Sequence, residues 1–238
     1  ALTTHLSHQT IVICKRDYRA SEGFPFLRRE KVTLIRNGVE QPRLMPRTSA
    51  RNVLSSLCSR VLVDENIWIG SIGELNDNKN HRLLINAIHD LQRKDIYTVI
   101  IGGGANYAAL QDQIRQLGLQ DQIFLTDYVL EANRLLSALD VFVLPSLKEG
   151  LPYALLEAAH AGLPTLAADV GGVSEVIRHR ETGLLFQAGE KRSLVRQLRN
   201  ILDSEPTRAS LGRHLGRSVQ SGYSVDAMID KIARLYCM

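Results

Sequence analysis

Two glutamates that stand eight positions apart form the first candidate for chemistry in this sequence. Glu149 and Glu157 lie in the stretch KEGLPYALLEAAH, residues 148–160. Glu149 follows a short apolar run that ends at Pro145-Ser146, whereas Glu157 lies among alanines and leucines. Two carboxylates can act as an acid–base pair, or each can accept hydrogen bonds from the hydroxyls of a ligand. The elements that position them decide between these roles.

The surroundings of Glu157 predict a buried carboxylate. Pro152 suits the first turn of a helix, and the neighbours of Glu157 are apolar almost all round, which indicates a largely buried helix. A carboxylate in such a helix costs free energy unless hydrogen bonds hold it. Two alternatives follow: the paired hydroxyls of a ligand such as a ribose, or neighbouring backbone N–H groups or an arginine.

A lysine at a helix start is the second candidate. The loop GELNDNKNH, residues 73–81, follows a strong apolar strand and opens a helix for which Asn78 is the expected N-cap. Lys79 at this position opposes the helix macrodipole unless an anion is near. A helix N-terminus with a lysine suits a phosphate group. The alternative is an ordinary exposed lysine.

From about residue 67 the chain alternates short apolar runs with amphipathic stretches. Strands are expected at residues 67–72, 97–101, 123–125, 141–145, 164–168 and 183–186. Helices are expected near 80–92, 107–118, 131–138, 152–161, 173–178, 190–203, 206–220 and 225–236. Uninterrupted apolar strands between helices predict an α/β fold, a doubly wound, Rossmann-like parallel sheet covered on both faces.

The beginning of the chain fits this pattern less well. TIVICK and KVTLIRNGVE are expected strands, and QPRLMPR, with two prolines, is an expected linker. Because the pattern starts in mid-course, we expect this chain to be a piece of a longer one. The sequence therefore predicts a remnant of a preceding domain with its linker at residues 1–45, and the Rossmann-like domain at residues 46–238.

Ligands of such sheets bind beyond the carboxyl ends of the strands. The loops expected there are 73–79, 102–106, 126–130, 145–152 and 169–173, and all except 126–130 contain glycine. The triple glycine at 102–104 does not complete GxGxxG because residue 107 is Tyr, so a nicotinamide dinucleotide is not indicated. These glycines make either a structural turn or a close backbone approach to a ligand.

Composition limits the remaining classes of function. The 238 residues carry a formal net charge of +4, and the three cysteines form no CxxC pair, which indicates a reducing compartment without disulfides or structural zinc. No apolar run approaches the ~18–20 residues of a membrane helix. The basic regions 15–51 and 178–217 attract phosphates in principle. They have few interleaved aromatics and no nucleic-acid motif, so nucleic acid is not an expected partner.

Taken together, these motifs resemble the C-terminal half of retaining nucleotide-sugar glycosyltransferases of the GT-B fold, most similar to glycosyltransferase family four. The resemblance covers residues from about 67 to 203 and keeps the expected order. It rests on SIGELNDNKNHRLLINAI, VIIGGGANYAALQDQIRQLGLQDQIFLTDY, LDVFVLPSLKEGLPYALLEAAHAGLPTLAADVGGVSEVI and TGLLF. VTLIRNGVE resembles the end of the family's N-terminal domain and its link to the second domain.

The resemblance implies two catalytic residues. Glu149 would contact hydroxyls of the donor sugar, with the backbone N–H groups of Gly150 and Leu151 near the sugar and the diphosphate. Lys79 would bind the diphosphate and stabilise its charge as the glycosidic bond breaks. Family members usually work without an essential metal, so neither a metal nor a cofactor is expected beside the substrate, a nucleotide sugar such as a UDP- or GDP-hexose.

The resemblance also implies further contacts with the donor. Glu157 would accept hydrogen bonds from the ribose hydroxyls, and Tyr128 and Val129 would lie against the base. Many members of the family carry an arginine where this chain has Glu74, and that arginine also holds the diphosphate. A glutamate cannot do so. The remaining expected donor contacts are Ser71, Gly73 and Gly102.

The expected activity is transfer of a hexose to a saccharide or lipid acceptor in polysaccharide or glycolipid synthesis. Since the acceptor domain is represented only by its last residues, we expect this polypeptide alone to bind nucleotide sugar weakly and to transfer nothing. The expected location is the cytoplasm, at the inner face of the membrane with a peripheral contact. The alternatives are a GT-B nucleotide-sugar epimerase and a non-catalytic nucleotide-sugar-binding module, which Glu74 favours slightly.

Overall fold

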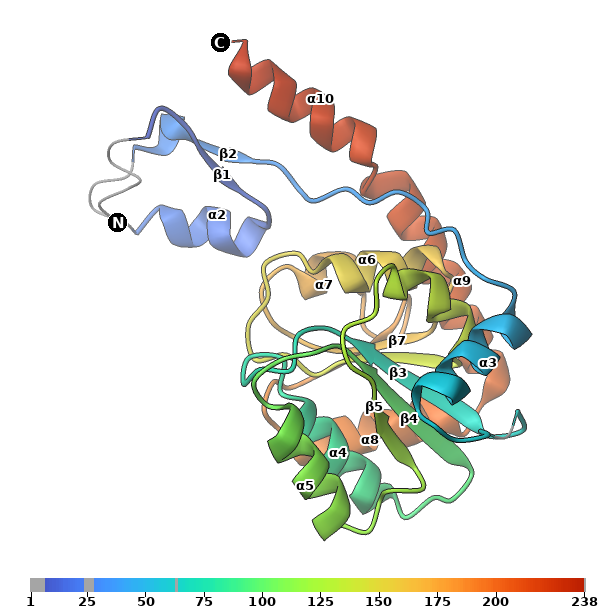
Figure 1. The fold of residues 1–238 in the computed structure, drawn as a ribbon. Coiled ribbons are helices and arrows are strands. Elements are labelled where there is room, and N and C mark those ends of the chain that lie inside the picture. Colours follow the sequence, from blue (N-terminus) through green and yellow to red (C-terminus); the bar gives the residue numbers. More distant parts are fainter. Residues whose placement is uncertain (1–6, 24–27, 63, 238) are drawn as a thin grey trace.

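A six-stranded parallel sheet forms the centre of the molecule (Figure 1). The computed structural model describes residues 7–23, 28–62 and 64–237. The strand order is β5-β4-β3-β6-β7-β8. The strands are β3 Ile67–Ile72, β4 Ile96–Ile101, β5 Ile123–Leu125, β6 Val141–Leu144, β7 Thr165–Ala168 and β8 Leu184–Phe186. Each strand expected from residue 67 onward is present, so the prediction of a doubly wound Rossmann-like sheet is confirmed.

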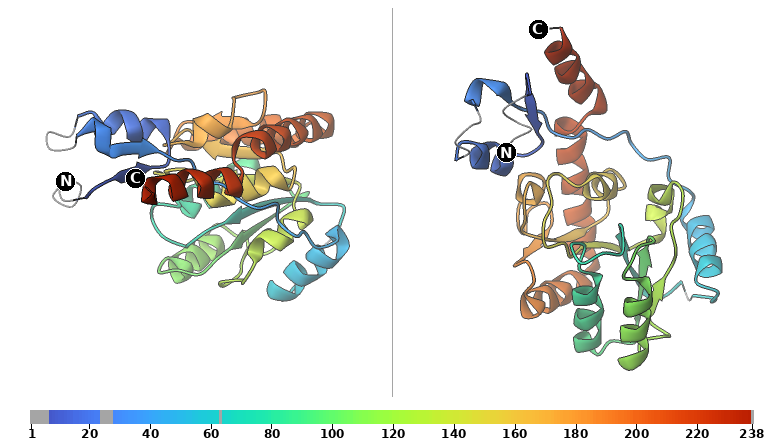
Figure 2. Two further views of the ribbon diagram at one scale, coloured as in Figure 1. Left: turned by 90° about the horizontal axis from the view of Figure 1, so that it is seen from above. Right: turned by 60° about the vertical axis from the view of Figure 1, so that its left-hand side comes forward.

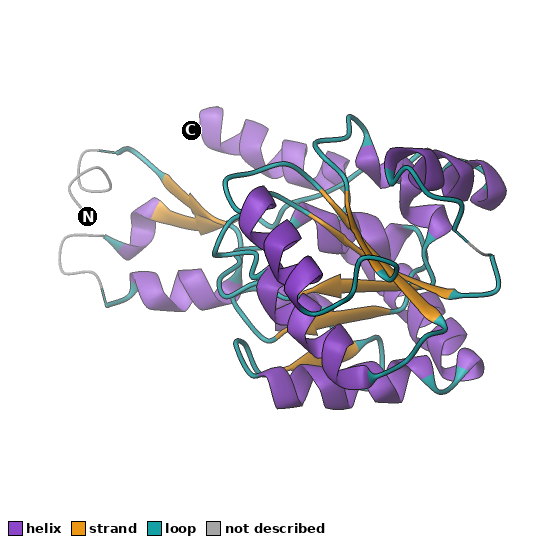
Figure 3. Ribbon diagram, turned by 60° about the horizontal axis from the view of Figure 1, so that its bottom comes forward, coloured by secondary structure: helices purple, strands orange, loops and turns teal. Residues whose placement is uncertain are grey.

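Helices pack on both faces of this sheet (Figure 3). On one face α4 contacts α5 and α8, and on the other α6 contacts η2 and α9. The bounds are α3 Arg47–Leu57, α4 His81–Leu91, α5 Tyr107–Gln116, the 3-10 helix η2 Ala132–Ala138, α6 Tyr153–His160, α7 Val173–Val176, α8 Lys191–Leu202, α9 Glu205–Gly222 and α10 Val225–Tyr236. No helix among the described residues is long and apolar enough to cross a membrane.

Helix α3 was not predicted from the sequence. Part of its contact with the sheet is made by a buried cation. Arg51 is almost fully buried and lies over the ring of Trp68, with 4.7 Å between the guanidinium carbon and the ring centroid. It forms ion pairs of 2.9 Å with Asp64 and 3.0 Å with Asp140. Partners this far apart in the sequence give no periodic signal, so only the tertiary structure reveals them.

The direction in which the chain crosses the sheet reverses between β3 and β6, which lie side by side. Ligand sites of open parallel sheets lie outside the carboxyl ends of such a strand pair. The two loops that leave these strands are bonded to each other: Leu147 N donates to Asn78 O at 2.7 Å, and Asn78 Nδ2 donates to Lys148 O at 3.0 Å. The fold therefore brings together the two loops singled out in the sequence.

A smaller unit at the start of the chain lies apart from this sheet (Figures 1 and 2). It consists of β1 Thr10–Val12, α2 Lys15–Ser21, the 3-10 helix η1 Arg29–Lys31 and β2 Val32–Leu34. The two expected strands are present and pair in parallel, whereas α2 was not expected. The division of the chain at residue 45 stays a prediction, and residues 1–6 and 24–27 of the predicted remnant lie outside the described residues.

Glu175, in α7, joins the small unit to the sheet. Its carboxylate accepts hydrogen bonds from Arg36 Nη2 at 2.9 Å and from Arg36 Nε at 3.2 Å, and one from the backbone N–H of Lys15, the first residue of α2. Its backbone oxygen accepts a bond of 2.9 Å from Tyr223 Oη. The side chain is only 15% exposed, so solvent screens these bonds weakly.

Replacing Glu175 with alanine is expected to loosen the small unit. The change removes hydrogen bonds to a charged acceptor, which typically contribute about 2 kcal/mol when partly buried. Hydrogen exchange should therefore speed up in β1 and α2. The matched control is Glu22→Ala, because the Arg29–Glu22 pair is exposed. Equal protection in wild type and Glu175→Ala would show that the small unit is held by other contacts.

Candidate functional site

The two residues predicted to be catalytic lie in direct contact. Lys79 Nζ is 2.6 Å from Glu149 Oε1, and Ser146 Oγ donates to the same oxygen at 2.6 Å. The Lys79 side chain is 20% exposed and that of Glu149 is 9% exposed. Glu149 Oε2 has no hydrogen-bond partner among the described residues. The site thus presents one ammonium group and one carboxylate oxygen at the carboxyl ends of β3 and β6.

The loop before α4 differs from its prediction in one respect. Asn78 is not the N-cap, because α4 begins at His81 and Asn80 precedes it in a left-handed conformation, with φ of 52°. The amide of Asn78 is instead engaged with the loop after β6. Asn76 Oδ1 accepts the backbone N–H of Lys79 at 3.0 Å, and this bond fixes the backbone from which the lysine side chain extends.

The glycines after β4 allow this loop to pack against the loop after β3. At Gly102, with φ of +151°, a Cβ atom would lie 2.1 Å from Gly73 O. Leu75 N also donates to Gly103 O at 2.9 Å. A Cβ atom at Gly73 would lie 3.4 Å from Cε of Lys79, so the lysine stem passes over this backbone. The structure thus supports a structural role for Gly102 in the turn after β4. Contacts of Gly73 and Gly102 with a donor stay predictions.

A second pair of loops fixes the backbone around Glu149. Gly172 N donates to Gly150 O at 2.7 Å, and Asn37 Nδ2 donates to Leu151 O at 2.7 Å. Gly171 has φ of +54°, and a Cβ atom there would lie 1.6 Å from Glu149 O, so only glycine fits. Within the described residues, the N–H groups of Gly150 and Leu151 make no hydrogen bond. Their contact with a sugar or diphosphate stays a prediction.

Glu157 is held by an amide that sequence reasoning missed. Asn133 Nδ2, in η2, donates to Glu157 Oε1 at 2.9 Å. Burial raises the pKa of Glu157 above its usual range, and the bond from Asn133 opposes this shift. The protein partners expected from sequence, a backbone N–H or an arginine, are therefore wrong. Asn133 carries no motif and stands 24 residues away, so no sequence signal points to it.

The residues predicted to meet the base lie on the loop after β5. Tyr128 is 74% exposed, and its N–H donates to Asp127 Oδ1 at 2.7 Å. Val129 is partly buried against the core. A Cβ atom at Gly103 would lie 2.6 Å from Asp127 Oδ1, so this loop touches the glycine turn after β4. The structure brings the loop to the same edge of the sheet, and its contact with a base stays a prediction.

Ser71 and His81 form a buried pair beneath the loop after β3. Ser71 is fully buried, and its Oγ lies 3.2 Å from His81 Nε2. His81 Nδ1 is buried without a hydrogen-bond partner. Burial, assisted by the charge of Lys79, lowers the pKa of His81 to about 4. Ser71 thus supports the start of α4, and its contact with a donor stays a prediction.

The buried His81 is expected to make stability fall in acid. Its folded pKa lies below the unfolded value, so its contribution is fully present above pH 6.5 and is lost as the pH falls towards 4. The whole window corresponds to about 3 kcal/mol. Urea unfolding at pH 7.5 and 4.5 should show a smaller acid loss in His81→Gln than in wild type. The same loss in both proteins would assign the acid sensitivity to other groups.

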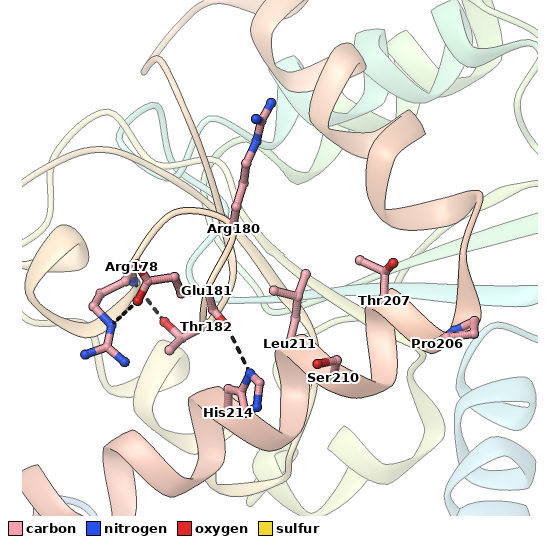
Figure 4. Close-up of a pocket in the computed structure, with 9 residues that line it drawn as sticks. All are labelled: Arg178, Arg180, Glu181, Thr182, Pro206, Thr207, Ser210, Leu211 and His214. Atoms are coloured by element: carbon pink, nitrogen blue, oxygen red, sulfur yellow. Dashed lines mark hydrogen bonds and ion pairs between the residues drawn. The ribbon is translucent and has the colours of Figure 1, made fainter.

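A separate hollow lies away from these loops (Figure 4). It has a volume of about 650 Å³ between the segment before β8 and the first half of α9. Because β8 is parallel to the other strands, the segment before it lies at the amino edge of the sheet. Arg178 is paired with Glu181 at 3.0 Å, and the ring Nδ1 of His214 lies 3.2 Å from Glu181 O. Two of its side chains, Arg178 and His214, are thus engaged with Glu181.

Residues 59–215 match the family described as glycosyl transferases group 1. The chain belongs to the glycosyl transferases group 1 family. This match confirms the family resemblance, and it includes each predicted site residue. Among the described residues of this group 1 chain, no cluster of three His, Cys, Asp or Glu side chains could hold a metal ion.

Relatives and solved structures agree with the assignment to group 1. The chain is 25% identical over 211 residues to an Escherichia coli UDP-Gal:alpha-D-GlcNAc-diphosphoundecaprenol alpha-1,3-galactosyltransferase, covering 87% of this chain and 54% of the relative. The structure of Anabaena HepE in complex with UDP-glucose superimposes with a TM-score of 0.86 at 20% identity, covering 99% of this chain and 65% of that one. A sucrose-phosphate synthase from Thermosynechococcus elongatus gives a TM-score of 0.87 at 21% identity, with coverage of 99% and 59%.

The two solved structures share the GT-B fold with this chain. The chain spans about half the length of the curated relative from Escherichia coli. The activity and partners of a whole protein are therefore matters for proposal.

Proposed function

We propose that this chain forms the donor-binding half of a retaining glycosyltransferase that takes a hexose from a nucleoside-diphosphate hexose, such as a UDP- or GDP-hexose. The Lys79–Glu149 pair carries this proposal, because it sets a cation beside an acceptor of hydroxyl hydrogen bonds at the switch point of the sheet. Lys79 binds the diphosphate. Glu149, held through Oε1 by Ser146, offers Oε2 to the sugar hydroxyls.

The electrostatics of the site favour departure of the diphosphate. As the bond between the anomeric carbon and the phosphate oxygen breaks, negative charge grows on the leaving group. The Lys79 ammonium group and the N–H groups of Gly150 and Leu151 stabilise that charge. The acceptor oxygen then bonds to the anomeric carbon from the face that the diphosphate leaves, and the leaving phosphate takes its proton. Since these cationic and N–H groups meet the charge, we propose that the reaction needs no metal.

The remaining proposed donor contacts also lie at the carboxyl ends of the strands. Glu157 accepts hydrogen bonds from the ribose hydroxyls, and Tyr128 and Val129 lie against the base. The loop residues Gly73 and Gly102 line the diphosphate side, and Ser71, at the end of β3, lies beneath them. Support comes from the strand ends that bring these loops to one edge of the sheet.

A panel of nucleotides tests the donor proposal. UDP, GDP and ADP are each added with EDTA, and thermal unfolding is followed. A diphosphate that binds only the folded chain raises its stability, by about 2.7 kcal/mol at a hundred times its dissociation constant. We expect one base to stabilise most and EDTA to have no effect. If no diphosphate in the millimolar range shifted the transition, the proposal would be wrong.

The proposed function requires a further domain that binds the acceptor. We propose a saccharide or lipid acceptor in polysaccharide or glycolipid synthesis, at the inner face of a cytoplasmic membrane. The name of the Escherichia coli relative, which specifies a diphosphoundecaprenol-linked acceptor, supports a lipid-linked class. With acceptor present, this chain alone should bind donor and transfer nothing. Turnover by this chain would contradict the need for a further domain.

A non-catalytic nucleotide-sugar-binding module is the second candidate, and Glu74 favours it. Its carboxylate accepts a bond of 2.9 Å from Asn76 Nδ2 on the exposed surface, in a place where a second cation would help to hold a diphosphate. An assay of the full-length protein with donor and acceptor distinguishes the two candidates. Slow release of hexose from donor supports a transferase, whereas donor binding with no release or transfer supports the module.

A further inference from the structure

Helix α8 carries an arrangement of charge that works against its own stability. Its sequence, KRSLVRQLRNIL, contains four cations and no acid. Arg192, Arg196 and Arg199 are exposed and recur at the i, i+4 and i+7 positions of one face. Like charges at i, i+4 destabilise a helix, and cations in its first turn oppose the macrodipole. A local conflict of this kind is expected at a functional surface.

The three arginines have no partner that would offset this cost. Their guanidinium groups form no ion pair or side-chain hydrogen bond within the described residues. The nearby carboxylate of Asp90 is already neutralised, because Lys191 Nζ lies 2.7 Å from its Oδ2. The other face of α8 is buried through Leu194, Leu198 and Ile201. The helix is thus anchored while its arginines face outward.

The arginines line a hollow of about 610 Å³. It lies between α8 and the end of α4, two helices packed side by side (Figures 1 and 2). Asp90, Gln92, Val195 and Asn200 complete its wall, and the Asp90 carboxylate on that wall is the one paired with Lys191. The end of α4 lies about 15 Å along the helix from its start at the candidate donor site. Both places can therefore be occupied at once.

We propose that this hollow binds a phosphate group, carried by a phospholipid headgroup or by a soluble phosphate compound. Guanidinium groups match phosphate geometry with two parallel hydrogen bonds, and three of them line this hollow. Electrostatics, not insertion of apolar side chains, holds the ligand.

The test compares two triple variants of equal charge. In the first, Arg192, Arg196 and Arg199 are changed to glutamine; in the second, the exposed Arg213, Arg217 and Arg234 are changed. One arm measures sedimentation with phosphatidylcholine vesicles containing phosphatidylglycerol, at low and high salt. The other arm measures binding of inorganic phosphate and pyrophosphate by calorimetry. Circular dichroism checks that both variants fold.

The hollow variant is expected to lose on the order of a hundredfold in affinity, and the control variant much less. Binding to vesicles alone that the hollow variant loses assigns the phosphate to a headgroup, whereas binding of phosphate or pyrophosphate that the hollow variant loses assigns it to soluble compounds; both outcomes support the hollow. Equal losses in the two variants would show attraction by net charge only and would overturn the proposal. Absence of wild-type binding in both arms at low salt would overturn it as well.

Discussion

Changing Lys79 to glutamine is expected to weaken the binding of UDP and of UDP-glucose by the same factor, about ten- to a hundredfold. The range corresponds to the loss of a hydrogen bond between charged groups, roughly 1.5–3 kcal/mol. UDP is the first probe because solved structures of the same fold contain it. The equal factor is expected because Lys79 is assigned to the diphosphate, which both ligands share. Isothermal titration calorimetry measures both affinities.

Glu149→Gln is expected to give the opposite pattern. It removes a negative charge next to the diphosphate site and the ion pair that engages Lys79 Nζ at 2.6 Å. UDP should therefore bind as well as before or better. The preference for UDP-glucose over UDP should fall, because a glutamine accepts sugar hydroxyl bonds without a charge. The two variants thus separate the diphosphate role from the sugar role.

The matched control for this pair is Lys148→Gln, a change of the neighbouring exposed lysine that removes the same charge. It should leave both affinities within about twofold if the effect of Lys79 is a specific contact. Because Lys79→Gln leaves the largely buried Glu149 carboxylate without its cation, unfolding is measured separately. A loss of affinity confined to UDP-glucose in Lys79→Gln would contradict the diphosphate assignment.

Glu157→Gln is expected to stabilise the free chain at neutral pH while weakening its hold on ribose. Burial raises the folded pKa of Glu157, so its contribution to stability is greatest below the unfolded value and is lost as the pH rises through the folded pKa. Near pH 7 the ionised carboxylate is therefore a net cost. Glutamine has the same shape, stays neutral and still accepts the bond from Asn133. Urea unfolding at pH 4.5 and 7.5 should show an advantage of the variant only at the higher pH.

The ribose assignment is tested with UDP and 2′-deoxy-UDP. If Glu157 accepts a bond from the 2′-hydroxyl, wild type should prefer UDP by about tenfold, and Glu157→Gln should reduce that preference. The matched control is Glu131→Gln, an exposed glutamate beside η2, which should change neither the preference nor the stability. An unchanged ratio of the two affinities in Glu157→Gln would place Glu157 away from the ribose, even if its stability behaves as expected.

The sheet could be predicted because its cause is local in the sequence. Apolar runs such as IWIGSI and YTVII are buried on both faces, which only a covered parallel strand allows. The carboxyl ends of parallel strands lie at one edge of the sheet, so Lys79 and Glu149 could be assigned to that edge before any distance was known. The small unit was predicted less well: its two strands were expected, but α2 was not.

What the sequence determined by itself was therefore the α/β class, the strand ends and the loops that carry Lys79, Glu149 and Glu157. The tertiary structure decided the partners: Asn133 on Glu157, Ser146 on Glu149 and the buried Arg51 that docks α3. A run of apolar residues indicates a buried strand, and the residues of that run are neighbours in the sequence. A side-chain hydrogen bond between residues far apart leaves no period, because it depends on how whole elements pack.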